Sequence, residues 1–416
     1  MFERAPREPE WVSWLWVALW SGFVFALVPL ARALEAIVEG RLGRVAFLYA
    51  VFAALALAGG LAVRQLWRAG GVPAGQALAL AIVGAFYAAY IWQLRDSPVE
   101  ALHFVQYGVL GILAFRALSQ RIPDPSVYVG AALVGGAVGI LDEAIQWATP
   151  QRVWDLRDMG FNFIGAGAIQ VGIAAGIQPA HISPRLTPRG LRRICAIAGG
   201  CVLLLTLSLL NTPPRIAAYT QAVSGLSFLA ERPDVMIEYG HRYEDPEVGV
   251  FRSRYSPADL ARVDAERGHE AGGTLAVFPG DAAAFLAEYT AIRDPFLHEM
   301  RVHLFRRDRY LETAESRREG SGKWRSLRKV AARENLILER YFPVTLQHSG
   351  AKLGEAERRR LAEDAQPGTP YESRVSEGLI TRFREVHVIV GAASSMLLLW
   401  VLARAGGRRL AARDGA

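Results

Sequence analysis

Eight long apolar runs constrain this chain more than any other feature of its sequence. Each run is roughly 18–21 residues long, which is enough for a helix to cross the ~30 Å hydrocarbon core of a bilayer. The predicted spans are 11–31, 45–64, 74–93, 101–118, 127–146, 158–178, 192–210 and 386–404. We therefore expect an all-α polytopic membrane protein with about eight transmembrane helices.

One long polar segment, 211–385, separates the last two spans. It holds 27 basic and 27 acidic residues, so the net charge of +7 lies entirely in the rest of the chain. That excess is arginine scattered beside apolar runs rather than a basic face, which argues against nucleic acid as a partner. The segment is long enough for its own core. We expect it to form a mixed, mainly helical extramembrane domain inserted before the last helix.

The arginines of the short connections predict the orientation. Fourteen of them lie on the side of the chain termini and six on the other side. The positive-inside rule makes the first side cytoplasmic, so both termini are expected inside and 211–385 outside the cytoplasm. The expected parts are two N-terminal transmembrane helices (1–73), a transmembrane core (74–178), a cytoplasmic loop with the seventh helix (179–210), the extracytoplasmic domain (211–385), and the last helix with a basic cytoplasmic tail (386–416).

Local signals indicate several elements within the polar segment. Apolar periodicity predicts helices near 216–230 and 281–291. Ser256, followed by Asp259 three residues later, resembles a capping box at a helix start. Residues 300–312 fit either a strand or a helix. Residues 313–335 are so rich in charge that an exposed helix or a mobile linker is expected.

A short histidine motif in this segment raises the question of a metal site. His298, Glu299 and His303 resemble the zinc-protease pattern, which needs its two histidines four residues apart on one helix face. Here the spacing is five residues, which separates the two side chains by roughly 140° around a helix. We therefore predict no metal site and interpret the motif as a solvated, salt-bridged face.

Three spans carry polar residues that lipid would reject. Two sets have the spacing i, i+3, i+7 of one helix face: Glu100, His103 and Tyr107, and Asp155, Asp158 and Asn162. A third set, Asp142, Glu143 and Gln146, ends the fifth span. Alternating spans bring all three sets to one membrane face, where such residues normally face the bundle interior or a water-filled cavity. The alternative is that each is an ordinary loop or cap residue. Small-residue pairs, Gly135/Gly139 and Gly172/Gly176, favour close helix packing nearby.

The polar spans resemble the VanZ-like family of small bacterial membrane proteins. The resemblance rests on EALHFVQYGVLGILAFRAL and GILDEAIQWATPQRVWDLRDMGFNFIGAGAIQ, and it covers about residues 80–178. The family's hallmark positions match His103, Tyr107, Asp142, Glu143, Gln146, Pro150, Arg152, Asp158, Asn162 and Gly165. The resemblance implies a membrane protein of the cell envelope, in a glycopeptide-resistance or envelope-polysaccharide setting. It supplies no reaction.

Two functions from different classes follow as hypotheses. In the first, the outer-face cluster binds or processes the headgroup of a lipid or a lipid-linked glycan. His103 and Glu143 are then the candidate acid/base pair, and Asp142 or Asp158 orients the histidine or holds a divalent ion. The candidate binding residues are Tyr107, Gln146, Arg152, Asp155, Asp158 and Asn162, with Arg152 on an anionic group.

In the second hypothesis the cluster is a structural polar plug and the chain is a non-catalytic assembly protein. The extracytoplasmic domain then binds a cell-wall or polysaccharide partner. A transporter is disfavoured, because the chain has no duplicated halves and its acidic residues lie at one face rather than at mid-membrane. Membrane lipids are expected partners under either hypothesis, whereas cofactor, oligomeric state and reaction stay open.

Overall fold

The computed structural model describes residues 8–43, 45–68, 70–95, 100–150, 152–278, 281–366 and 368–414. Within these ranges the chain is mostly helical, and eight helices are long and apolar enough to cross a membrane. The prediction of a helical, multi-pass membrane protein is thereby confirmed at this level. Arg4, Arg7 and Arg44, which contribute to the predicted orientation, lie outside the described residues.

The chain divides into two compact units, which are described separately. The first comprises Met1–Ser208 with Ile389–Ala416, and the second comprises Leu209–Val388. The second unit is close in extent to the predicted domain 211–385. Its placement outside the membrane stays a prediction, as does the finer division of the chain.

The first unit is built from long helices. They are α1 (Glu10–Leu27), α2 (Ala31–Leu42), α3 (Val45–Arg68), α4 (Ala74–Gln93), α5 (Ala101–Ser119), α6 (Ser126–Ala148), α7 (Leu156–Val171) continued by the π-helical turn η1 (Gly172–Ile177), α8 (Pro188–Leu209), and α16 (Glu385–Val401) continued by η3 (Leu402–Gly406) and α17 (Gly407–Asp414). α1 ends before the predicted residue 31, because Pro29 disfavours helix at the preceding residue and has no N–H to donate. The short helix α2 occupies what was expected to be a loop.

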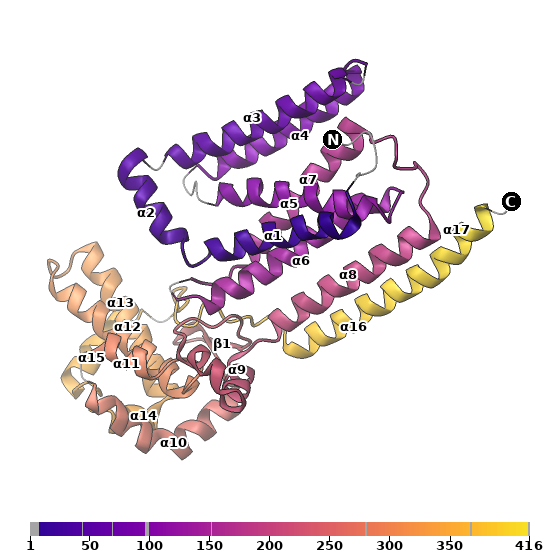
Figure 1. Ribbon diagram of the computed structural model, residues 1–416. Helices are drawn as coiled ribbons and strands as arrows, with labels where there is room; N and C mark the ends of the chain where they lie inside the picture. The colour runs from indigo at the N-terminus through magenta and orange to yellow at the C-terminus, as the bar shows by residue number, and fades with distance from the viewer. Residues whose placement is uncertain are drawn as a thin grey trace. The chain divides into compact units, whose positions relative to one another are not determined.

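Helices α5, α6 and α7 form the centre of this unit and lie against one another (Figure 1). Glycines permit the close approach: a Cβ atom on Gly139 would lie 2.8 Å from the Cβ of Asn162, and one on Gly111 would lie 2.7 Å from Ile169. The Tyr87 hydroxyl of α4 donates a 2.6 Å hydrogen bond to the carbonyl of Gly165 on α7. The expected packing role of the small residues is therefore observed, since Gly135 faces Ala166 in the same contact.

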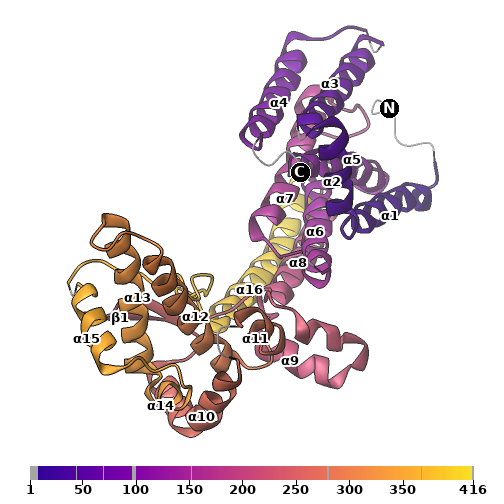
Figure 2. The same ribbon diagram turned by 90° about the vertical axis from the view of Figure 1, so that its left-hand side faces the viewer.

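Peripheral helices surround this centre. α1 packs on α5, and the Trp20 indole donates to the carbonyl of Gln106 at 2.9 Å. α3 and α4 pair as a hairpin, and α8 runs beside α16 in both views (Figures 1 and 2). The centre is well covered, with about half of α5 and α6 buried, whereas none of the α16 span is buried within the structure. The exposed apolar faces of the peripheral helices are suited to lipid.

The second unit is mainly helical, with one small sheet. Its elements are α9 (Pro213–Ala222), the 3₁₀-helix η2 (Ser224–Glu231), β1 (His241–Asp245), β2 (Gly249–Ser253), α10 (Pro257–Val277), α11 (Ala282–Glu288), α12 (Pro295–Glu315), α13 (Gly322–Tyr341), α14 (Pro343–His348) and α15 (Glu355–Asp364). β1 and β2 form an antiparallel hairpin in which Tyr243 is opposite Phe251. The core gathers large apolar side chains from the hairpin and from α10 to α14, among them Phe251, Phe285, Phe296 and Phe342.

Local capping explains where several of these helices begin. The Ser256 side chain accepts from the N–H of Asp259 at the start of α10, as predicted. Asp294 and Ser321 cap α12 and α13 in the same way. The undecided stretch 300–312 lies inside α12 and is helical. The predicted helix 216–230 is instead divided into α9 and η2, with a break at Val223.

Two expectations about charged residues in this unit hold only in part. Residues 315–330 are exposed or half-buried, and Glu299 and His303 are ion-paired, as predicted. Residues 331–335, within the supposedly exposed stretch 313–335, are buried on α13. Glu299 and His303 are fully buried, not solvated. Both are paired with residues distant in sequence: Glu299 accepts from the N–H of Arg254, and His303 contacts Glu334 at 2.7 Å. A buried charge is tolerated when a partner of this kind satisfies it.

The two ends of the second unit are joined to each other. The Arg215 guanidinium forms a 2.6 Å ion pair with Glu385, and the Thr212 hydroxyl donates to the same carboxylate at 3.1 Å. The Tyr239 hydroxyl donates to the carbonyl of Leu209 at 2.9 Å. The segments that enter and leave the unit are therefore neighbours.

Candidate functional site

The predicted polar residues meet where α5 begins, α6 ends and α7 begins. Their arrangement starts from a local feature, the N-cap of α7. The Asp155 carboxylate accepts from the N–H of Arg157 at 2.7 Å and pairs with the guanidinium of the same residue at 2.8 Å. Burial alone would raise the pKa of Asp155, but the hydrogen bonds and charge of Arg157 hold it below its usual value. This carboxylate is therefore engaged as a cap, as the alternative interpretation proposes for such residues.

A hydrogen-bonded chain links the end of α6 to the loop before α7. The Gln146 amide donates to Glu143 at 2.7 Å, and Arg152 donates to the amide oxygen of Gln146. The other oxygen of Glu143 accepts from the backbone N–H of Asp155 at 2.9 Å. Glu143 and Gln146 are almost completely buried. These hydrogen bonds hold the loop against the end of α6 and place the Arg152 guanidinium beside Gln146.

Other members of the cluster are buried with unfilled hydrogen-bonding positions. Tyr107 and Asn162 are 0% exposed and Asp142 is 1% exposed. Among the described residues, the Tyr107 hydroxyl, one Asp142 oxygen and both polar atoms of the Asn162 amide have no partner with hydrogen-bond geometry. Tyr107 approaches Asp142, and His103 approaches Asn162. Buried polar atoms of this kind are uncommon in folded proteins and point to a ligand or water at the site.

The cluster has a mixed charge distribution. Arg152 acts electrostatically on His103, Asp142 and Asp158, while Asp158 also interacts with Glu143. Glu100 contributes a further acid close to Asp158. One arginine therefore lies among several carboxylates and is the group suited to an anion.

The structure thus brings most of the predicted site together. His103 and Tyr107 from α5, the three residues from α6, Arg152, and Asp158 with Asn162 from α7 share one end of the bundle. The side chain of Asp155 pairs with Arg157, and its charge still acts on Glu143 and Asp158. No hydrogen bond joins His103 to Glu143 or Asp142 in the part of the chain that the structure describes. Nor do any three described His, Cys, Asp or Glu side chains lie together as a metal would need.

Two contributors to this region were not predicted. Tyr87 holds α7 in place through Gly165, and the Gln170 amide donates to the carbonyl of Gly111 at 2.9 Å. Both occur singly in apolar runs, so spacing carries no signal for them. Gln170 is nearly fully buried. An amide side chain inside an apolar span was the one signal in the sequence that could have singled it out.

Comparison of the chain with protein-family models, with curated proteins and with solved structures finds no match. The functional argument therefore depends on the residues and their geometry.

Proposed function

We propose that this chain is a VanZ-like integral membrane protein of the bacterial cell envelope, and that the end of its α5–α7 bundle binds the anionic headgroup of a lipid or a lipid-linked glycan. The family resemblance of residues 80–178 and the positive-inside orientation support the envelope setting. The observation that carries the binding site is the set of buried, unfilled polar atoms on Tyr107, Asp142 and Asn162.

The chemistry of the cluster favours binding over catalysis. Arg152 supplies a bidentate donor for a phosphate or carboxylate group. Asn162 and Tyr107 offer neutral donors suited to hydroxyl and ester oxygens. A catalytic reading needs His103 to be paired with a carboxylate, which its contact with Asn162 does not provide.

A specific observation favours the alternative of a structural plug. Glu143, Gln146 and Arg152 satisfy one another and fasten α6 to the loop before α7. If this is their whole role, the chain is a non-catalytic assembly protein and its Leu209–Val388 unit binds the partner. Buried polar groups are known to fix helix register in this way.

The two proposals differ in what an arginine variant does. Full-length protein is purified in a neutral detergent, and lipids that remain bound are identified by native mass spectrometry. We expect Arg152→Gln to lose an anionic lipid at unchanged protein yield. Arg157→Gln is the matched control, because it removes the same charge nearby from an exposed side chain.

If both variants retain as much lipid as the wild-type protein, the proposed binding site is contradicted. A fall in the yield and melting temperature of Arg152→Gln, with no lipid on the wild-type protein, would favour the structural plug.

A further inference from the structure

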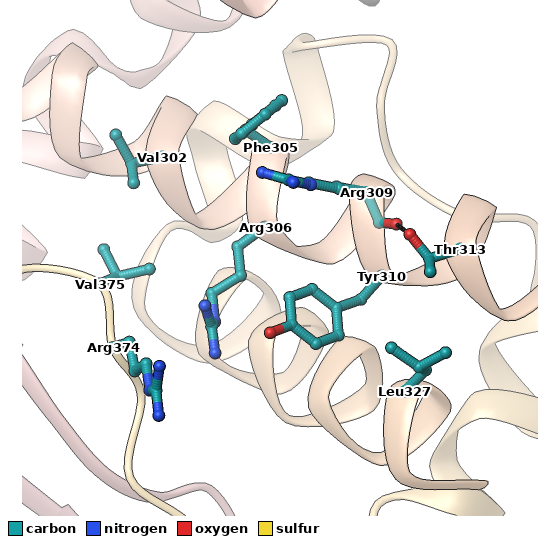
Figure 3. Close-up of a pocket in the computed structure, with 9 residues that line it drawn as sticks. All are labelled: Val302, Phe305, Arg306, Arg309, Tyr310, Thr313, Leu327, Arg374 and Val375. Carbon is teal, nitrogen blue, oxygen red and sulfur yellow. Dashed lines mark hydrogen bonds between the residues drawn. The ribbon is translucent and has the colours of Figure 1, made fainter. Parts of the chain in front are cut away.

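A second polar site lies in the Leu209–Val388 unit, well separated in sequence from the cluster described above. It is a pocket of about 490 Å³ between α12, α13 and the segment around residue 374 (Figure 3). Its polar lining comes from Arg306, Arg309, Arg374, Tyr310 and Thr313, and none of its lining residues is acidic. Apolar side chains, including Phe305 and Leu327, complete the wall.

Two of the three arginines stack on aromatic side chains of α12. Arg306 packs on the ring of Tyr310 at 4.8 Å, and Arg309 lies over Phe305 at 5.9 Å. These are i, i+4 pairs on α12, where such stacking is favoured. In Figure 3 the guanidinium groups of Arg306 and Arg374 and the Tyr310 hydroxyl point into the same part of the pocket.

Within the part of the chain that the structure describes, one of these cations is neutralised by a carboxylate. Arg306 forms a 3.0 Å ion pair with the fully buried Glu334. Arg309 and Arg374 are exposed and form no ion pair with any residue that the structure describes. The pocket therefore retains roughly two positive charges.

Glu334 also positions the opposite wall of the pocket. Its carboxylate accepts 2.7 Å hydrogen bonds from the hydroxyls of Tyr371 and Ser373, which precede Arg374 in the chain. His303 binds the second oxygen of the same carboxylate. Glu334 thus holds the Arg306 side chain directly and fixes the backbone next to Arg374, which preorganises this part of the pocket.

We propose that this pocket binds the phosphate group of an organic phosphate monoester. The uncompensated guanidinium group of Arg374 and the Tyr310 hydroxyl point to one place beside Arg306, while Arg309 extends toward Phe305 and adds positive charge at the edge of the pocket. Planar guanidinium groups bind phosphate oxygens in pairs. The pocket volume lies in the range of small-molecule sites. The apolar wall of Phe305, Leu327 and Val302 would accommodate the organic part.

The phosphate has two possible sources, and the experiment separates them. Full-length protein in a neutral detergent is titrated calorimetrically with glucose 1-phosphate, a soluble sugar phosphate, and with dihexanoyl phosphatidic acid, a soluble lipid. We expect saturable binding of at least one probe, and the probe that binds identifies a soluble or a lipid source. Arg374→Gln should weaken it by about tenfold, because it removes a charge-assisted hydrogen bond. Arg309→Gln should have a smaller effect, because the Arg309 guanidinium lies over Phe305.

The matched control is Arg318→Gln, which removes an exposed arginine that does not line the pocket. It should bind the probe as the wild type does. Glu334→Gln tests the positioning role, since it should weaken binding although this carboxylate is negative and cannot attract an anion itself. The proposal is overturned if neither probe binds, or if Arg374→Gln binds as well as Arg318→Gln does. Neither result bears on the binding site proposed at the end of the α5–α7 bundle, because that site is tested with different variants and a different assay.

Discussion

Several charged side chains are buried in the interior of the Leu209–Val388 unit. Arg333 is 0% exposed and donates to the backbone carbonyls of Ala365, Gln366 and Glu247. Its burial lowers the pKa of the guanidinium. Glu334 beside it is also fully buried, and its pKa is lowered because its four partners outweigh the effect of burial. Each buried charge thus ties together segments that are more than thirty residues apart.

His298 predicts a pH dependence of stability. Burial first, and the neighbouring charge of Arg254 second, lower the pKa of His298 to about 4. Below about pH 6.5 the imidazole of His298 is therefore protonated in the unfolded chain but stays neutral in the folded chain. The free energy of unfolding should therefore fall, by about 1–3 kcal/mol, as the pH drops from about 6.5 to about 4. Thermal unfolding of the full chain across this range measures the loss.

The variant His298→Asn removes the titrating group and should flatten the pH dependence in that window. If this variant loses as much stability as the wild type between the same pH values, another group is responsible.

The helices of the bundle centre depend on contacts between glycines and neighbouring side chains. Gly139 on α6 faces Asn162 on α7, whereas Gly160 on α7 has no other group within 4 Å of where its Cβ would lie. The two glycines therefore make a matched pair for substitution by alanine.

We expect opposite effects from the two changes. Gly139→Ala should lower the stability of the bundle by about 1–3 kcal/mol, because its new methyl group overlaps the Asn162 side chain. Gly160→Ala should be neutral or stabilise by about 0.5–1 kcal/mol, the usual gain of alanine within a helix. Thermal unfolding in detergent, monitored by tryptophan fluorescence, compares them. Equal effects would show that the α6–α7 contact is looser than described.

Elements that depend on local signals could be predicted from the sequence. Apolar length predicts the eight spans, and Ser256 predicts the start of α10. Alternating spans also bring His103, Asp142 and Asn162 to one end of the bundle. Contacts between distant residues could not be predicted, since no spacing rule joins His303 or Arg306 to Glu334. The helix α12 could not be predicted for the same reason. Its apolar face is interrupted by arginines, whose buried partners come from distant parts of the sequence.

At the scale of the whole molecule, the orientation in the membrane is a prediction with a direct test. In a version with Cys195 and Cys201 replaced by alanine, single cysteines are placed at Arg157, Glu319 and Arg185. A membrane-impermeant thiol reagent applied to intact cells should label the first two positions. The third should react only after lysis, because it lies on the predicted cytoplasmic side.

Labelling of Arg185→Cys alone in intact cells would show that the orientation in the membrane is the reverse of the predicted one. The polar cluster and the Leu209–Val388 unit would then face the cytoplasm, and an envelope substrate would be excluded.

The joined ends of the second unit have a consequence for biogenesis. α8 and α16 lie side by side, yet about 175 residues are made between them. At roughly 5–20 residues per second, α8 waits about 9–35 s in the membrane before α16 emerges. During that time α6 supports it, since Ile197 lies near Gly130 and the Cys201 thiol contacts the carbonyl of Leu133 at 3.3 Å. The residues of the polar cluster all precede α8, so the last helix contributes none of them.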